Sequence, residues 1–280
     1  MNGARRFQRG QLSDRWTSLE PALFAMGWPE PSLTRLKEAA RRLPAVEGFG
    51  LEVHADGARI DLALQIWPGG RARDQAWWSL SERDRRLLPE GVVALLDRWR
   101  STPGLHDPGT SAFVELDLDD EARPPSLFFA FGRPPELAAV VGAAEALGLP
   151  PERVEAVRRW AGAPIKHLGA RQTAEGLEAR VSVADEMILN HSILNIYKNV
   201  AITAGLRLDP DGHTTLLGLE LKPLDGWTAL DAALVAAGVS AADVSPWGAV
   251  EVPGARLFRN HVKLTPDGRV AKHYLGVIWG

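Results

Sequence analysis

The chain has 280 residues, of which 45% are hydrophobic, so it can bury a large core, and its net charge of −3 argues against a general electrostatic affinity for nucleic acid or an anionic membrane. It contains no cysteine, which excludes disulfides, thiolate zinc sites and cysteine nucleophiles. Because no run of about eighteen apolar residues occurs and no apolar signal-peptide stretch follows the basic start, we expect a cytoplasmic protein without a membrane partner.

Segments with helical periodicity or helix boundaries alternate along the chain with pairs of strands. The N-terminal segment 1–45 is expected to be helical, with a helix over 32–43. Further helices are predicted over 81–99, 134–147, 150–160 and 185–197, and from Asp225 or Thr228 to Val235.

Four turns that end in glycine predict hairpins, because glycine adopts positive φ without steric cost. They lie at 54–57, 173–176, 209–212 and 265–268. A fifth pair of strands is joined by residues 120–125. The expected strand pairs are 51–54 with 58–67, 111–119 with 126–132, 163–172 with 177–183, 200–208 with 214–222, and the two strands of the closing hairpin 259–280.

Five repeated ββα units predict an α+β fold in one domain spanning 1–280, built on a ten-stranded antiparallel sheet. Such a sheet could stay open, split in two or close into a barrel with the helices outside. Open sheets of this width are uncommon, and closure removes the exposed edges. We therefore expect a barrel.

Strand alternation separates an apolar face from a polar one. The apolar face, which the helices should cover, carries Leu51, Val53, Ile60, Leu62, Leu64, Val114, Leu116, Leu118, Val181, Val183, Ile202, Leu206, Leu217, Leu219 and Leu221. The polar face carries Glu52, His54, Arg59, Asp61, Gln65, Glu115, Asp117, Glu178, Arg180, Thr203, Arg207, Glu220, Lys222, Arg259, His261, Lys263, Lys272 and Tyr274. This second face meets solvent if the sheet is open and lines the interior if the sheet closes.

The repeated αββα plan and the Lys272-His-Tyr274 pattern resemble the ABBA-type prenyltransferases, with comparable basic alternation in His261-Val-Lys263 and Glu220-Leu-Lys222. The resemblance covers nearly the whole chain at the level of architecture. It implies a barrel that holds an isoprenoid diphosphate together with an aromatic small molecule or a peptide, and it implies transfer of the isoprenoid between them.

The resemblance also assigns roles to the polar face. Lysine and arginine would stabilise the departing diphosphate, and aromatic rings would shield the allylic cation. The diphosphate-binding candidates are Arg59, Lys166, Arg180, Arg207, Lys222, Lys263, Lys272 and Tyr274. The candidates for removing a proton from the acceptor are Glu115, Asp117 and Glu220.

The sequence is compatible with function either with or without a metal ion. The two-residue spacing of Glu115 and Asp117 puts them about 7 Å apart on one strand face, which suits Mg²⁺ carrying a diphosphate, although the sequence does not require a metal. The histidines show no metal-ligand spacing, so we expect no zinc site. Dinucleotide-binding, P-loop and Gly-x-Ser-x-Gly motifs are absent.

A second hypothesis is a non-catalytic protein that binds a ligand or peptide on the same scaffold. It is favoured by the acidic residues of the polar face, which could neutralise most of its bases. These are Glu52, Asp61, Glu115, Asp117, Glu178 and Glu220.

Overall fold

The computed structural model of the protein describes most of the chain. The described residues are 12–25, 28–41, 48–54, 60–66, 86, 90–102, 110–117, 125–174, 176–184, 200–209, 211, 213–241, 244, 250–252 and 255–279. The predicted helix over 185–197, the candidate Arg59 and the turn at 54–57, apart from its first residue, lie outside them.

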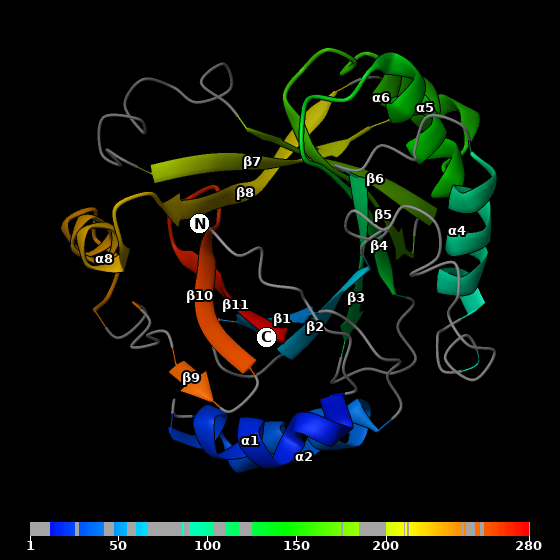
Figure 1. Cartoon of the computed structure of the whole chain (residues 1–280). Coiled ribbons are helices and arrows are strands. Elements are labelled where there is room, and N and C mark those ends of the chain that lie inside the picture. The colour runs from blue at the N-terminus through cyan, green and yellow to red at the C-terminus, as the bar shows by residue number, and fades with distance from the viewer. Residues whose placement is uncertain are drawn as a thin grey trace, which may run out of the picture.

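One antiparallel sheet contains all the described strands and curls around on itself (Figure 1). The strands are β1 (Gly48–His54), β2 (Ile60–Ile66), β3 (Thr110–Asp117), β4 (Ser126–Phe131), β5 (Ile165–Thr173), β6 (Gly176–Ala184), β7 (Val200–Leu208), β8 (Thr214–Pro223), β9 (Val250–Val252), β10 (Ala255–Leu264) and β11 (Val270–Trp279). Their order is β11-β1-β2-β3-β4-β5-β6-β7-β8-β10-β9, and β11 also pairs with β10. The five predicted hairpins are confirmed, whereas β9 was not predicted.

The closing hairpin shows why the turns could be predicted. The backbone N–H of Thr265 donates to the carbonyl oxygen of Arg269 at 2.8 Å, and the N–H of Gly268 donates to the carbonyl of Thr265 at 2.9 Å. Gly268 has φ 86°, the left-handed conformation that glycine adopts readily.

The described helices lie around the outside of the curled sheet (Figure 1). They are α1 (Leu12–Ala25), α2 (Glu30–Ala40), α4 (Glu90–Ser101), α5 (Leu137–Ala146), α6 (Pro151–Arg158) and α8 (Trp227–Ala236). Pro151 at the start of α6 is well placed, since the first helical position needs no backbone donor. None of the helices that the structure describes is both long enough and apolar enough to cross a membrane.

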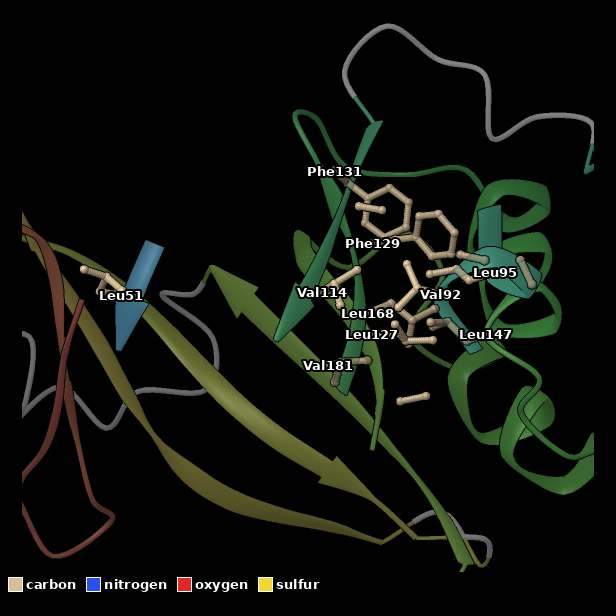
Figure 2. Packing of buried hydrophobic residues seen from close by; sticks show 14 of the residues in the cluster. Leu51, Val92, Leu95, Val114, Leu127, Phe129, Phe131, Leu147, Leu168 and Val181 are labelled. Carbon is tan, nitrogen blue, oxygen red and sulfur yellow. The ribbon is translucent and has the colours of Figure 1, made fainter. Parts of the chain in front are cut away.

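The core lies between the outer face of the sheet and the helices. Figure 2 shows Val92 and Leu95 of α4 packed toward Phe129 of β4, and all three side chains are fully buried. A second buried cluster lies under α8, where Leu230 and Leu234 belong with Ile202, Ala204, Leu219, Leu221, Val262, Leu264 and Val270. Removing these apolar side chains from water is a main source of the fold's stability, at roughly 1.5 to 3 kcal/mol for each large one.

Two irregularities correct the face assignments made by strict alternation. Between Gly205 and Leu206 the pairing of β7 with β8 shifts, so Leu216 lies opposite Leu206 and packs against the core, in place of the predicted Leu217. In β10 the register shifts between Arg259 and His261. A β-bulge of this kind inserts one residue and reverses the side-chain parity that follows it.

The bulge in β10 moves Arg259 to the outer face, so its predicted place beside His261 was wrong. Its side chain is 1% exposed, and Nη1 donates to Oδ1 of Asp231 in α8 at 2.7 Å. The guanidinium lies 3.7 Å from the ring centroid of Trp227, whose Nε1 donates to the Arg259 carbonyl at 3.2 Å. Arg259 therefore attaches α8 to the sheet.

Candidate functional site

Cross-strand register brings charged residues together on the inner face of β8, β10 and β11. Lys263 of β10 lies opposite Glu220 of β8 on one side and opposite Lys272 of β11 on the other. One row further along, Tyr274 of β11 lies between His261 of β10 and Glu52 of β1. We call Glu52, Glu115, Glu220, His261, Lys263, Lys272 and Tyr274 the central cluster.

Lys272 is held by two carboxylates from different strands. Its Nζ lies 2.6 Å from Oε2 of Glu52 in β1 and 3.6 Å from Oε1 of Glu115 in β3. The three side chains are only 15%, 8% and 14% exposed, so water screens these pairs weakly. Two predicted site residues, Lys272 and Glu115, are thus in direct contact.

His261 connects the other half of the cluster. Its ring stacks on that of Tyr274, with centroids 3.8 Å apart and planes 20° apart. Its Nε2 lies 3.9 Å from Oε2 of Glu220. That separation is too long for a hydrogen bond but short enough for strong attraction if the imidazole is protonated.

The pKa values of Glu220 and His261 are both shifted down. Burial opposes ionisation of Glu220, but the basic groups around it, whose protonated forms attract the carboxylate, hold the pKa of its carboxyl below the ordinary value. Those groups are His261, Lys263, His167 and Lys272.

Burial lowers the pKa of His261 to about 4, although the Glu220 carboxylate opposes this shift. At neutral pH the pair is therefore an uncharged imidazole beside a carboxylate. Burial also lowers the pKa of His167 of β5.

Lys263 is the least compensated cation of the cluster. Within the part of the chain that the structure describes it makes no ion pair, although Glu220 lies directly opposite. Its side chain lies across Gly218, which has φ 150°, and a Cβ there would lie 3.2 Å from Cε of Lys263 and 2.3 Å from the Leu264 carbonyl oxygen. A glycine is thus needed for β8 to approach β10 at this point.

Aromatic rings share the inner face with these charges. Phe113 of β3 meets His167 edge to face, with centroids 6.0 Å apart. The ring of Phe258 lies over Gly276, and that of Phe128 lies over Gly169, where a Cβ would meet ring atoms at 2.5 Å and 2.1 Å. Together with Tyr274, the ring of Phe258 provides a π face beside the central cluster.

A second group of charges lies on β6 and β7. Arg180 donates from Nε to Oε1 of Glu178, and Nη1 of Arg207 lies 4.0 Å from the other oxygen of that carboxylate. Nε of Arg207 lies 3.3 Å from Oδ1 of Asp209. We call these four residues the arginine cluster. Arg180 and Arg207, which the sequence predicts to bind the diphosphate, are thus both neutralised by carboxylates.

The remaining predicted residues are more peripheral. Lys166 lies at a register shift of β5 next to His167, and Lys222 is exposed near the end of β8. Asp117 is half-buried near the end of β3, where its backbone pairs with that of Asp61.

Mg²⁺ does not fit the described residues well, since the Glu115 carboxylate already holds the Lys272 ammonium. Among the residues that the structure describes, no group of three or more His, Asp or Glu could hold a metal ion.

The sequence alone did not predict a role for His167 or His261 in the site. Neither has metal-ligand spacing, and only the fold brings His261 beside Glu220. The available signal was the alternation of His261 with Lys263 in the closing hairpin, which places both on the face that carries Tyr274.

No protein-family model and no curated protein matches the sequence. Among solved structures, the chain is similar to AnaPT from Neosartorya fischeri, with 13% sequence identity and a TM-score of 0.49 over 98% of this chain and 95% of that one. The likeness is one of overall fold, and nothing about activity follows from it.

Proposed function

We propose that this chain transfers an isoprenoid from an allylic diphosphate to an aromatic small molecule or a peptide side chain. The observation that carries the proposal is the central cluster, which combines lysine ammonium groups, a carboxylate–imidazole pair and an aromatic stack on one inner face. The resemblance of the Lys272-His-Tyr274 pattern to the ABBA-type prenyltransferases supports the same reaction.

The reaction separates charge as the carbon–oxygen bond of the donor breaks. Negative charge grows on the diphosphate, and Lys263 is the best candidate to bind it because its charge is not consumed by an ion pair within the described chain. Lys272 and Lys222 would add to the positive electrostatic potential that attracts the diphosphate. Ammonium groups held in place in a partly desolvated site stabilise such a leaving group more than free cations in water.

Positive charge grows on the allylic carbons. The face of Tyr274 and the ring of Phe258 border the same part of the sheet and would stabilise this cation through their π electrons. The contribution of each ring is expected to be about 0.5 to 2 kcal/mol, depending on how far water is excluded.

We further infer that the sheet forms a closed barrel of ten strands, with β9 as an addition at its edge. The pairing of β11 with both β1 and β10 supports this inference. Closure would keep water from the allylic cation and favour transfer over hydrolysis.

The alternative is a protein that binds its ligand without chemistry. The neutralisation of Lys272 by Glu52 and Glu115 favours it, as does that of the arginine cluster, because each pair reduces the attraction for an anion. The two functions differ in turnover, and the binding protein needs no anionic ligand.

Incubation of the purified protein with dimethylallyl or geranyl diphosphate and a panel of aromatic compounds and peptides tests the proposal. Mass spectrometry should detect prenylated acceptor, with release of an equal amount of diphosphate, and Lys263→Ala should lower the rate by at least tenfold. Donor binding without any product would support the binding protein. Absence of both donor binding and product would contradict prenyl transfer.

A further inference from the structure

The central cluster contains an imidazole that the proposed leaving-group chemistry does not use. His261 is 21% exposed and Glu220 is 17% exposed, so neither side chain is sealed from a ligand on the inner face. No hydrogen bond to another described side chain occupies the imidazole nitrogens of His261, and its stack on Tyr274 fixes the plane of the ring. Its orientation therefore comes from packing, and its nitrogens remain available.

We propose that His261 and Glu220 act as one proton-accepting unit for the aromatic acceptor, with His261 taking the proton and Glu220 balancing the resulting charge. This inference rests on the proposed prenyl transfer. It extends the sequence-based prediction, which considered only the carboxylates Glu115, Asp117 and Glu220.

The carboxylates alone are poorly suited to accept the proton of the acceptor ring. Glu115 is engaged by Lys272 at 3.6 Å. Glu220 faces Lys263 across the strand pair, so that ammonium offsets part of the charge of its carboxylate. A neutral imidazole 3.9 Å from that carboxylate can accept a proton and form an ion pair in the same step.

The groups that face His261 come from several strands. Glu220 and Lys222 belong to β8, His167 to β5, Lys263 to β10 itself, and Lys272 and Tyr274 to β11. Several of these groups shift the pKa of His261. Glu220 favours the protonated imidazole, whereas His167, Lys222 and Lys263 oppose it. This makes Glu220 the partner on which proton acceptance depends.

The step conserves atoms and charge. The acceptor ring carbon attacks the allylic carbon, and the electron pair of the broken carbon–oxygen bond leaves with the diphosphate. The ring proton then passes to an imidazole nitrogen of His261, and the electron pair of the ring C–H bond restores aromaticity. The products are the prenylated ring, free diphosphate and an imidazolium beside the Glu220 carboxylate.

One test follows the His261 imidazole by NMR with ring-labelled histidine, and His261→Phe assigns its signal while preserving an aromatic ring against Tyr274. The titration is also run in a Lys263→Met background, where removal of that ammonium should raise the pKa of His261. Adding Glu220→Gln should lower the midpoint of the His261 titration, because it removes the carboxylate that favours the protonated imidazole. A midpoint that does not respond to Glu220→Gln would overturn the pairing, whatever the protein's activity.

The second test measures turnover of the full chain. His261→Phe should lower kcat by about 100-fold or more, the usual contribution of a positioned base, while donor affinity stays within threefold. Glu220→Gln combined with His261→Phe should be no slower than the slower single variant, because the two residues act as a unit. His213→Phe changes an exposed histidine and serves as the control.

The outcomes separate the two proposals. Unchanged kcat in His261→Phe would overturn the proton-accepting role while leaving prenyl transfer intact. Absence of turnover by the unsubstituted protein would overturn prenyl transfer, and the NMR result would still decide whether His261 and Glu220 are coupled.

Discussion

The central cluster and the arginine cluster both combine basic and acidic side chains on the same inner face, yet they balance charge differently. In the arginine cluster, Glu178 lies between two guanidinium groups and Asp209 takes one of them as well. In the central cluster one ammonium, Lys272, is shared by two carboxylates, while Lys263 makes no ion pair within the described chain. The composition of a sheet face therefore does not identify an anion site, because cross-strand register decides which charges are already paired.

The largest expected difference concerns stability. Lys272→Ala would remove the cation from two poorly exposed carboxylates, so we expect the free energy of unfolding to fall by about 3 kcal/mol. Arg180→Ala should cost less, about 1 kcal/mol, since Glu178 keeps Arg207 nearby. Chemical denaturation measures both. Equal losses would remove the energetic contrast between the clusters.

Acidification should weaken the central cluster selectively. Since the pKa of His261 is about 4 in the folded chain and 6.5 ordinarily, the unfolded chain binds more protons between these values, and stability falls as pH is lowered through this range. Between pH 7 and pH 5 the loss from this group should be roughly 1 to 2 kcal/mol. Denaturation of the unsubstituted protein and of His261→Phe at both pH values tests this; an equal pH dependence would contradict it.

Arg259 provides a contrast between the two faces of β10. Because its planar guanidinium contacts Asp231 and the Trp227 ring at once, Arg259→Lys should destabilise the fold by about 1 to 2 kcal/mol. It should leave diphosphate affinity unchanged, since the residue lies on the outer face. A clear loss of affinity with unchanged stability would return Arg259 to the inner face.

The smallest effect is expected at Arg207. Its side chain is 40% exposed, its nearer partner Asp209 is 30% exposed, and Glu178 lies 4.0 Å away and keeps Arg180, so Arg207→Ala should change the free energy of unfolding by less than about 1 kcal/mol. The exposed pair of Lys37 and Glu20 provides a matched control, with Lys37→Ala expected to behave similarly. A loss above 2 kcal/mol would show that the ion pairs of Arg207 are stronger than those of an exposed surface pair.

Local patterns predicted the hairpins and most of the helices. Turn chemistry at 265–268 and alternation in β11 depend on neighbouring residues, so one strand pair at a time could be predicted from the sequence. The same alternation placed Glu220, Lys263, Lys272 and Tyr274 on one face, and the cross-strand register brings them together. Whether they bind a diphosphate stays a prediction.

Features that depend on distant strands could not be predicted. The bulge that turns Arg259 outward has no distinct residue signal, and it is stabilised by contacts with Asp231 and Trp227 of α8. The contact of His261 with Glu220 depends on how β8 pairs with β10. Pairing of Lys272 with Glu52 joins strands from opposite ends of the chain.

Calorimetric titration with dimethylallyl diphosphate tests whether an allylic diphosphate binds at the central cluster. We expect binding by the unsubstituted protein, a loss of at least tenfold in affinity for Lys263→Ala, equivalent to about 1.4 kcal/mol, and a change below twofold for Arg207→Ala. Equal losses in the two variants, or no binding by the unsubstituted protein, would contradict binding at the central cluster.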